Sequence, residues 1–84
     1  MELAILLVED DPKLGQTIKQ DLTDKGYKVD VAFDGKIAQS LYAANKYDIA
    51  LLDINVPYVN GWELCKIIRS SNKDIPIIML SALG

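Results

Sequence analysis

Acidic residues follow two apolar segments of the chain, and their type suits a metal site. Glu9 and Asp10 come directly after the apolar run at 3–8, and Asp53 comes directly after the run at 49–52. In open α/β sheets, ligands bind beyond the carboxyl ends of the strands. If these two runs are neighbouring strands, the three carboxylates converge there and raise one another's pKa. A hard divalent cation such as Mg²⁺, which prefers oxygen ligands, would neutralise them.

The same residues exclude one common class of ligand. A dinucleotide site needs glycines after the first strand, so that backbone N–H groups can approach a pyrophosphate, whereas residues 8–12 read VEDDP. Carboxylates repel a free phosphate unless a metal intervenes. With Mg²⁺ present, one carboxylate can act as a nucleophile toward phosphorus and form an aspartyl phosphate. Phosphoryl transfer requires mainly positioning and charge neutralisation, so a small acidic pocket suffices.

Composition excludes several other functions. The 84 residues contain no histidine and a single cysteine, Cys65, which excludes His-based catalysis, a disulfide framework and a cysteine-built zinc site. The net charge of −3 and the absence of a basic run argue against nucleic-acid binding by this segment. No apolar run approaches the roughly 18 residues of a membrane span, so we expect a cytoplasmic protein without a membrane partner.

Hydrophobic periodicity predicts four strands that alternate with three helices. Helical spacing follows Pro12 and stops at Gly26, recurs from about 37 to 45, and resumes at Gly61 before a polar loop at 71–74. The strands are expected at 3–8, 27–33, 49–53 and 77–80. This order indicates an α/β fold with a parallel sheet covered by helices on both faces. Alternation of apolar and polar residues over 27–33 indicates an edge strand.

The fourth apolar run, at 77–80, is as apolar as a central strand although the sequence ends shortly after it. We therefore expect that the sequence stops within a larger domain. An apolar strand at a sheet edge can pair with another chain. This predicts self-association through the edge of the fourth strand.

Three blocks carry a resemblance to a known family. They are LLVEDDP at 6–12, DIALLDINVPYVNGWEL at 48–64 and PIIMLSA at 76–82, and the middle block contains D-x-x-x-P-x-x-x-G as Asp53, Pro57 and Gly61. The sequence resembles the N-terminal part of bacterial response-regulator receiver domains. The resemblance implies a flavodoxin-like, three-layer α/β sandwich with a parallel sheet, truncated after the fourth strand. Residues 1–84 would then form an incomplete receiver domain, with the 2-1-3-4 strand order of that fold.

The resemblance also implies a role for individual residues. Asp53 would be the phosphoacceptor. Glu9, Asp10 and Asp53 would hold Mg²⁺, together with the backbone carbonyl of Asn55. Ser81 would hydrogen-bond the phosphoryl group. The function implied is that of a phosphorelay acceptor, not an enzyme, which receives a phosphoryl group from a sensor histidine kinase and regulates an output domain, in this family often a DNA-binding one that controls transcription.

The sequence departs from the family pattern at its end. Receiver domains continue with a fourth helix, a fifth strand that carries a lysine and an aromatic switch residue, and a fifth helix. The sequence ends at Gly84 without them, so we expect weakened phosphorylation chemistry in this segment.

Two alternatives remain open from the sequence. One is a non-catalytic interaction or dimerisation module that uses the fourth-strand edge. The other is a phosphatase with an aspartyl-phosphate intermediate. Such phosphatases usually carry the nucleophile after the first strand and an aspartate two residues later as general acid, whereas Asn55 cannot deliver a proton as a carboxylic acid does.

Overall fold

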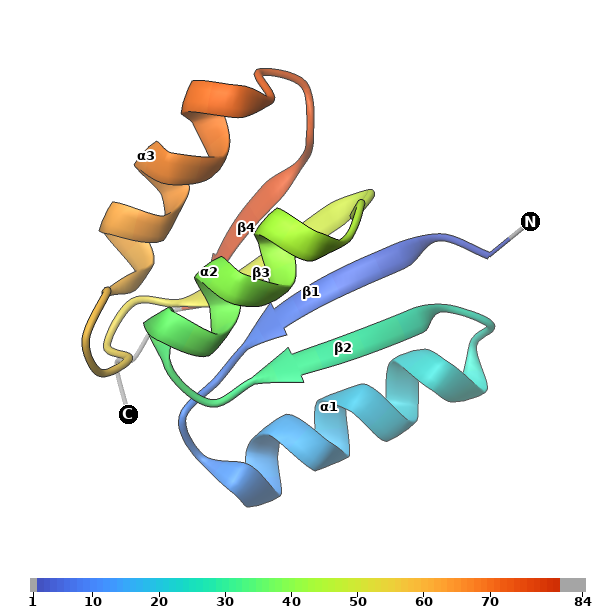
Figure 1. The fold of residues 1–84 in the computed structure, drawn as a ribbon. Coiled ribbons are helices and arrows are strands. Elements are labelled where there is room, and N and C mark those ends of the chain that lie inside the picture. Colours follow the sequence, from blue (N-terminus) through green and yellow to red (C-terminus); the bar gives the residue numbers. More distant parts are fainter. Residues whose placement is uncertain (1, 81–84) are drawn as a thin grey trace.

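The computed structural model describes residues 2–80, which form four strands and three helices in strict alternation (Figure 1). The predicted order is confirmed, and most predicted boundaries lie within a residue or two of the observed ones. Ser71 was expected in a loop but ends the third helix. The elements are β1 (Ala4–Val8), α1 (Pro12–Asp24), β2 (Lys28–Ala32), α2 (Gly35–Ala44), β3 (Ile49–Asp53), α3 (Gly61–Ser71) and β4 (Ile77–Leu80).

All strands of the described sheet are parallel, in the order β2-β1-β3-β4. This confirms the flavodoxin-like order and places β2 at an edge, as its alternating sequence predicts. The register pairs Val8 of β1 with Leu52 of β3. Because the strands are parallel, their carboxyl ends lie along one edge, where the arrowheads in Figure 1 gather. Glu9 and Asp53 therefore occupy neighbouring positions at this edge.

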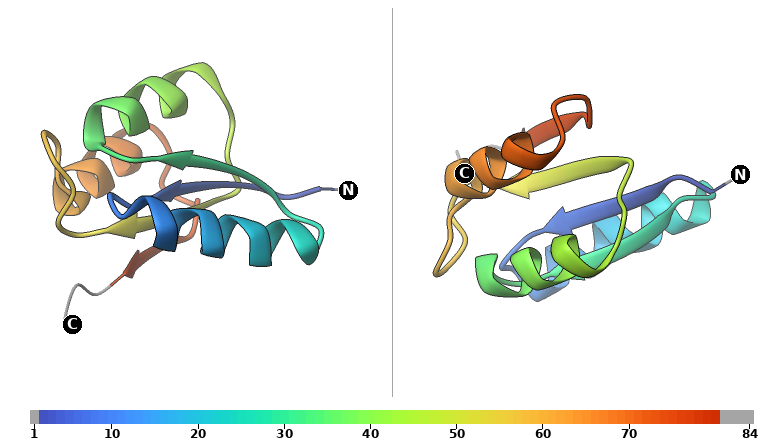
Figure 2. Two further views of the ribbon diagram at one scale, coloured as in Figure 1. Left: turned by 90° about the horizontal axis from the view of Figure 1, so that it is seen from below. Right: turned by 45° about the horizontal axis from the view of Figure 1, so that its top comes forward.

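Helices cover both faces of the sheet and create two apolar cores (Figure 2). On one face, Ile18 and Leu22 of α1 pack against a cluster that includes Ile5 and Leu7 of β1. On the other face, α2 and α3 pack against alternate residues of β1 and β3. Residues 5–8 are at most 2% exposed as a result. This double burial explains why β1 is an unbroken apolar run, since neither face meets water.

Polar caps start each helix immediately after a strand or loop at the carboxyl edge. Asp11 accepts hydrogen bonds from the N–H groups of Lys13 and Leu14, and Asp34 accepts one from Ile37. Asn60 and Glu63 form a reciprocal capping box at the start of α3. These side chains satisfy N–H groups that have no partner within the helix. The caps thus fix where each helix leaves the edge that carries the acidic residues.

In the described sheet, β4 is the outermost strand on the side opposite β2, and its Ile78 is 52% exposed. The exposure of this residue agrees with the expected apolar edge, while self-association through it stays a prediction. Within residues 2–80, no helix has the length and apolar character needed to cross a lipid bilayer.

Candidate metal and phosphoacceptor site

The structure brings three predicted site residues together at the carboxyl ends of the two central strands. Glu9 and Asp10 follow β1, and Asp53 is the last residue of β3. One carboxylate oxygen from each of the three lies within 4.8 Å of the others. Glu9 and Asp53 are only 5% and 8% exposed, whereas Asp10 is exposed. The site therefore has a buried acidic floor and one side open to solvent.

Backbone hydrogen bonds hold the two buried carboxylates in place. The N–H of Asp11 donates to Oε1 of Glu9 at 3.1 Å, and the N–H of Asn55 donates to Oδ1 of Asp53 at 3.2 Å. The backbone of Glu9 is itself tied to β2, because its N–H donates to the carbonyl of Ala32 at 3.0 Å. Each acid is thus oriented by the first residues of the turn that follows its strand.

Burial and crowding act on the titration of Glu9. Burial is the largest cause that raises the pKa of Glu9 above 4.5; the hydrogen bond from the Asp11 N–H lowers it, and the nearby Asp53 raises it. Repulsion between the carboxylates was the cause expected from the sequence. The direction is as expected for Glu9, but desolvation contributes more than charge because the side chain lies within the fold.

The donor set fits a hard divalent cation. All three groups offer carboxylate oxygens, the ligands that Mg²⁺ prefers, and Mg²⁺ usually keeps several waters in addition to one or two carboxylates. Two oxygens on opposite sides of a Mg²⁺ ion lie roughly 4 Å apart, so small side-chain rotations suffice to close the observed cluster around one ion. Glu9, Asp10 and Asp53 are the residues that could hold it.

The other two predicted site residues stand differently. Asn55 lies in the loop at 54–60, with an exposed side chain and an N–H directed to Asp53. The role of its carbonyl as a metal ligand stays a prediction. Ser81 lies outside the described residues.

Gly61, the first residue of α3, lies against the backbone of the proposed phosphoacceptor. A Cβ atom at position 61 would overlap the Asp53 carbonyl oxygen and come within 2.9 Å of the Cα of Ile54. The Gly61 N–H donates to the Ile54 carbonyl at 3.0 Å. The sequence indicated that this glycine begins a helix and belongs to the motif at 53–61, but not what it contacts. The structure gives the stronger reason, which is that only glycine lets α3 approach the end of β3 so closely.

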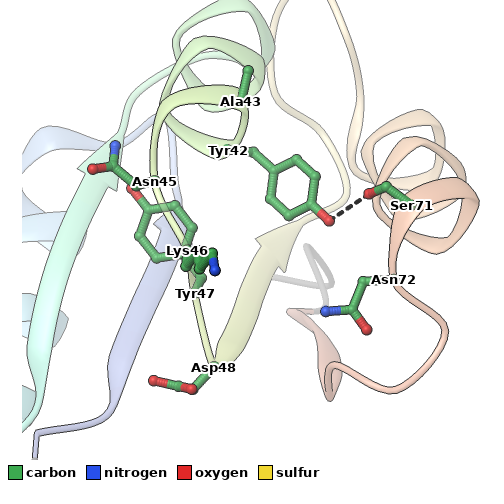
Figure 3. Close-up of a pocket in the computed structure, with 8 residues that line it drawn as sticks. All are labelled: Tyr42, Ala43, Asn45, Lys46, Tyr47, Asp48, Ser71 and Asn72. Carbon is green, nitrogen blue, oxygen red and sulfur yellow. Dashed lines mark hydrogen bonds between the residues drawn. The ribbon is translucent and has the colours of Figure 1, made fainter.

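A separate hollow lies at the opposite end of β3 (Figure 3). It has a volume of about 610 Å³ and lies between the C-terminal ends of α2 and α3, where the hydroxyl groups of Tyr42 and Ser71 are hydrogen-bonded at 2.7 Å. Its acidic residue, Asp48, accepts a hydrogen bond from the N–H of Ala4 at 2.8 Å. This carboxylate serves to connect the start of β3 to β1, and the hollow shares no residue with the acidic cluster.

Comparison with known proteins decides the family. The sequence pattern of the response regulator receiver domain matches residues 5–84, which is nearly the whole chain. The chain belongs to the response regulator receiver family. This receiver is a component of two-component signalling, and its acidic cluster lies at the ends of β1 and β3, where the order of apolar runs and acidic residues predicted it.

Relatives and solved structures agree with this assignment. The transcriptional regulatory protein CusR of Escherichia coli is 42% identical over 82 residues, which cover 98% of this receiver and 36% of CusR. The chain thus spans about a third of the length of the curated relatives that it matches. The receiver domain of the Francisella response regulator 1452 superposes with a TM-score of 0.90 at 41% identity, over 99% of this chain and 69% of that one.

A further neighbour has been solved with ligands. The response regulator TrrA of Thermotoga maritima, in complex with Mg²⁺-BeF, superposes with a TM-score of 0.91 at 36% identity, over 100% of this receiver and 72% of TrrA. TrrA has also been solved in complex with the histidine kinase ThkA, with a TM-score of 0.88 to this receiver. These likenesses confirm the receiver fold.

Proposed function

We propose that this receiver accepts a phosphoryl group on Asp53 from a sensor histidine kinase, in a reaction that requires Mg²⁺. The observation that carries the proposal is the convergence of three carboxylates within 4.8 Å at the ends of β1 and β3. The complexes of TrrA with Mg²⁺-BeF and with a histidine kinase support it by similarity. Cytoplasmic location and control of transcription belong to the same proposal, and the name of CusR supports the latter.

The chain's own residues have defined tasks in this reaction. A carboxylate oxygen of Asp53 forms the new bond to phosphorus while the phosphorus–nitrogen bond to the donor histidine breaks, and the histidine then takes up a proton. The Asn55 N–H holds Oδ1 of Asp53, which limits the orientations of the nucleophile. Glu9 and Asp10 complete the site for Mg²⁺, which, when bound, neutralises charge on the phosphoryl oxygens and the carboxylates.

Incubation of the full chain with a small acyl phosphate and Mg²⁺ tests the proposal directly. Intact-mass spectrometry should show one phosphoryl adduct, which disappears with a chelator or in Asp53→Asn. Asp48→Asn is the matched control, because Asp48 is an aspartate that directly precedes the same strand, at the end opposite Asp53. An adduct that persists in Asp53→Asn would contradict the assignment of the phosphoacceptor.

We further propose that the receiver is an acceptor and not a phosphatase. Residue 55 is asparagine, so the position two residues after the nucleophile offers no carboxylic acid to protonate a leaving group. Multiple turnover of a generic phosphate ester by the wild-type chain, lost in Asp53→Asn, would overturn this part of the proposal.

A further inference from the structure

The first turn of α2 lies directly on the loop that follows the proposed phosphoacceptor. The N–H of Gly35 donates to the carbonyl of Pro57 at 3.0 Å. A Cβ atom at position 35 would overlap the carbonyl oxygen of Val59 and come within 2.6 Å of the Val59 Cβ. Gly35 is buried. The backbones of α2 and of the loop at 54–60 therefore touch, with no room for a side chain between them.

Backbone conformation does not explain the glycine. Among the described glycines, only Gly26 has a positive φ, of 96°. Gly35 is the first residue of α2 and has no positive φ, so its backbone conformation is open to residues with a side chain. The close approach to Val59 is thus the feature of the structure that requires glycine at this position.

Other contacts fix the same loop. The Nζ of Lys36 lies 4.8 Å from the centre of the Tyr58 ring, a cation–π contact. Tyr58 has a φ of 71°, a left-handed conformation that a non-glycine residue keeps only when its surroundings impose it. Val56 is 6% exposed and belongs to the same core cluster as Ala38 of α2. Contacts of both its backbone and its side chains with α2 thus hold the loop at 54–60 in place.

Asn55 belongs to this loop and contacts Asp53, so the position of the loop affects the geometry of the acidic site. The Asn55 N–H donates a hydrogen bond to Asp53, and the resemblance to the receiver family implies that the Asn55 carbonyl is a fourth metal ligand. We propose that Gly35 is a positioning residue of the metal site: the contact of α2 with the loop at 54–60 fixes Asn55 and thereby determines the affinity for Mg²⁺. This inference rests on the proposed function and assigns to α2, which contributes no ligand, a role in metal binding.

Calorimetric titration of Mg²⁺ into the full chain tests the inference. Gly35→Ala forces the Val59 backbone to move, and we expect its Mg²⁺ affinity to fall roughly tenfold or more, as for other groups that orient metal ligands. The backbone amide resonance of Asn55 should shift in the same variant without metal. A residue with a merely structural role would change neither of these readouts.

Two control variants separate positioning from stability. Gly15→Ala makes the same chemical change in α1, where the new Cβ would lie in ordinary van der Waals contact, 3.4 Å from Val31 Cγ1 and 3.8 Å from the Cβ of Glu9, so that neither neighbour has to move. Tyr47→Phe removes a partly buried hydrogen bond to Asp30, and Tyr47 comes before β3, at the end opposite the acidic site. Both should bind Mg²⁺ within twofold of wild type. If Gly35→Ala fails to fold, Lys36→Ala is the deciding variant, because it frees Tyr58 of the same loop, and we expect its Mg²⁺ affinity to fall below the range of the two controls.

The outcomes distinguish the two proposals. Wild-type affinity retained in folded Gly35→Ala, or in Lys36→Ala when it has to decide, would overturn the positioning role alone. An equal loss in Tyr47→Phe would overturn it as well, because the effect would then be one of general stability. Absence of Mg²⁺ binding by the wild-type chain would overturn the proposed function and, with it, this inference.

Discussion

Glu9 and Asp53 lie side by side at the ends of the two central strands, one residue beyond the paired Val8 and Leu52, and both are buried. Burial and the neighbouring charge raise the pKa of Glu9. Two carboxylates in this position oppose folding when they are ionised and no cation is present. The two buried acids therefore lower the stability of the metal-free protein, and variants of Glu9 should show opposite effects on stability with and without metal.

Glu9→Gln should raise the melting temperature in the presence of a chelator and reduce Mg²⁺ affinity. Because the pKa of Glu9 is raised in the folded state, stability from this group is fully present below its ordinary value of 4.5 and is lost as the pH rises through the folded value. The metal-free wild type should thus gain stability relative to Glu9→Gln as the pH falls from neutral toward 4.5. Thermal melts of both proteins over this range check the prediction, and parallel curves would contradict it.

Asp10 is exposed, so its replacement should separate metal binding from folding. We expect Asp10→Asn to melt close to the wild-type temperature with a chelator, yet to lose most of the stabilisation by Mg²⁺. A ligand that binds only the folded state adds about 2.7 kcal/mol at a hundredfold excess over its Kd. Asp21→Asn, which also removes an exposed aspartate but near the C-terminal end of α1, should retain the full effect. Equal Mg²⁺ stabilisation of the two variants would argue against Asp10 as a ligand.

Gly61→Ala should damage both stability and phosphoryl acceptance. The added methyl would meet the Asp53 backbone, and overpacking of this kind costs about 1–3 kcal/mol. Because the atoms displaced belong to the proposed nucleophile and to Ile54, we also expect slower formation of the phosphoryl adduct. Chemical denaturation and timed mass spectrometry measure the two effects. If Gly61→Ala formed the adduct faster or were more stable than wild type, α3 would have to move away from β3 without cost, and the prediction would be wrong.

Tyr47→Phe should reduce stability by about 1–3 kcal/mol, because the 2.7 Å hydrogen bond from its hydroxyl to Asp30 is partly buried. Burial first, and then Asp30, raise the pKa of Tyr47 well above its ordinary 10.0. The stability from this raised pKa is intact below pH 10 and declines at higher pH, since only the unfolded tyrosine ionises readily there. Urea denaturation at pH 8 and pH 11 should therefore show a steeper decline for wild type than for the phenylalanine variant.

Much of the arrangement follows from local sequence. The unbroken apolar run of β1 predicts a central strand, the alternation in β2 predicts an edge, and parallel strands bring Glu9 and Asp53 to one end. Periodicity and caps are properties of a few consecutive residues, which explains this success. The sequence did not predict that burial would raise the pKa of Glu9 more than the neighbouring charge does, because burial depends on tertiary packing, which periodicity does not describe.

The contacts of the glycines could not be predicted in the same way. Gly35 and Val59 are 24 residues apart in the numbering, and their contact depends on how α2 crosses the sheet and where the loop at 54–60 turns. Nothing in the neighbouring residues of Gly35 signals a tertiary contact. Ser71 likewise extends α3 beyond the predicted boundary, where its hydroxyl meets Tyr42 of another helix.

The central place of β1 has a consequence for how the molecule fluctuates. Its amides are bonded between two strands and covered on both faces, so hydrogen exchange there requires the largest openings of the domain, whereas the outer strands can fray separately. Glu9 and Asp53 are attached to β1 and to its inner neighbour β3. We therefore expect Glu9 and Asp53 to keep their relative position during local openings of the outer strands, so that the arrangement for binding a cation persists.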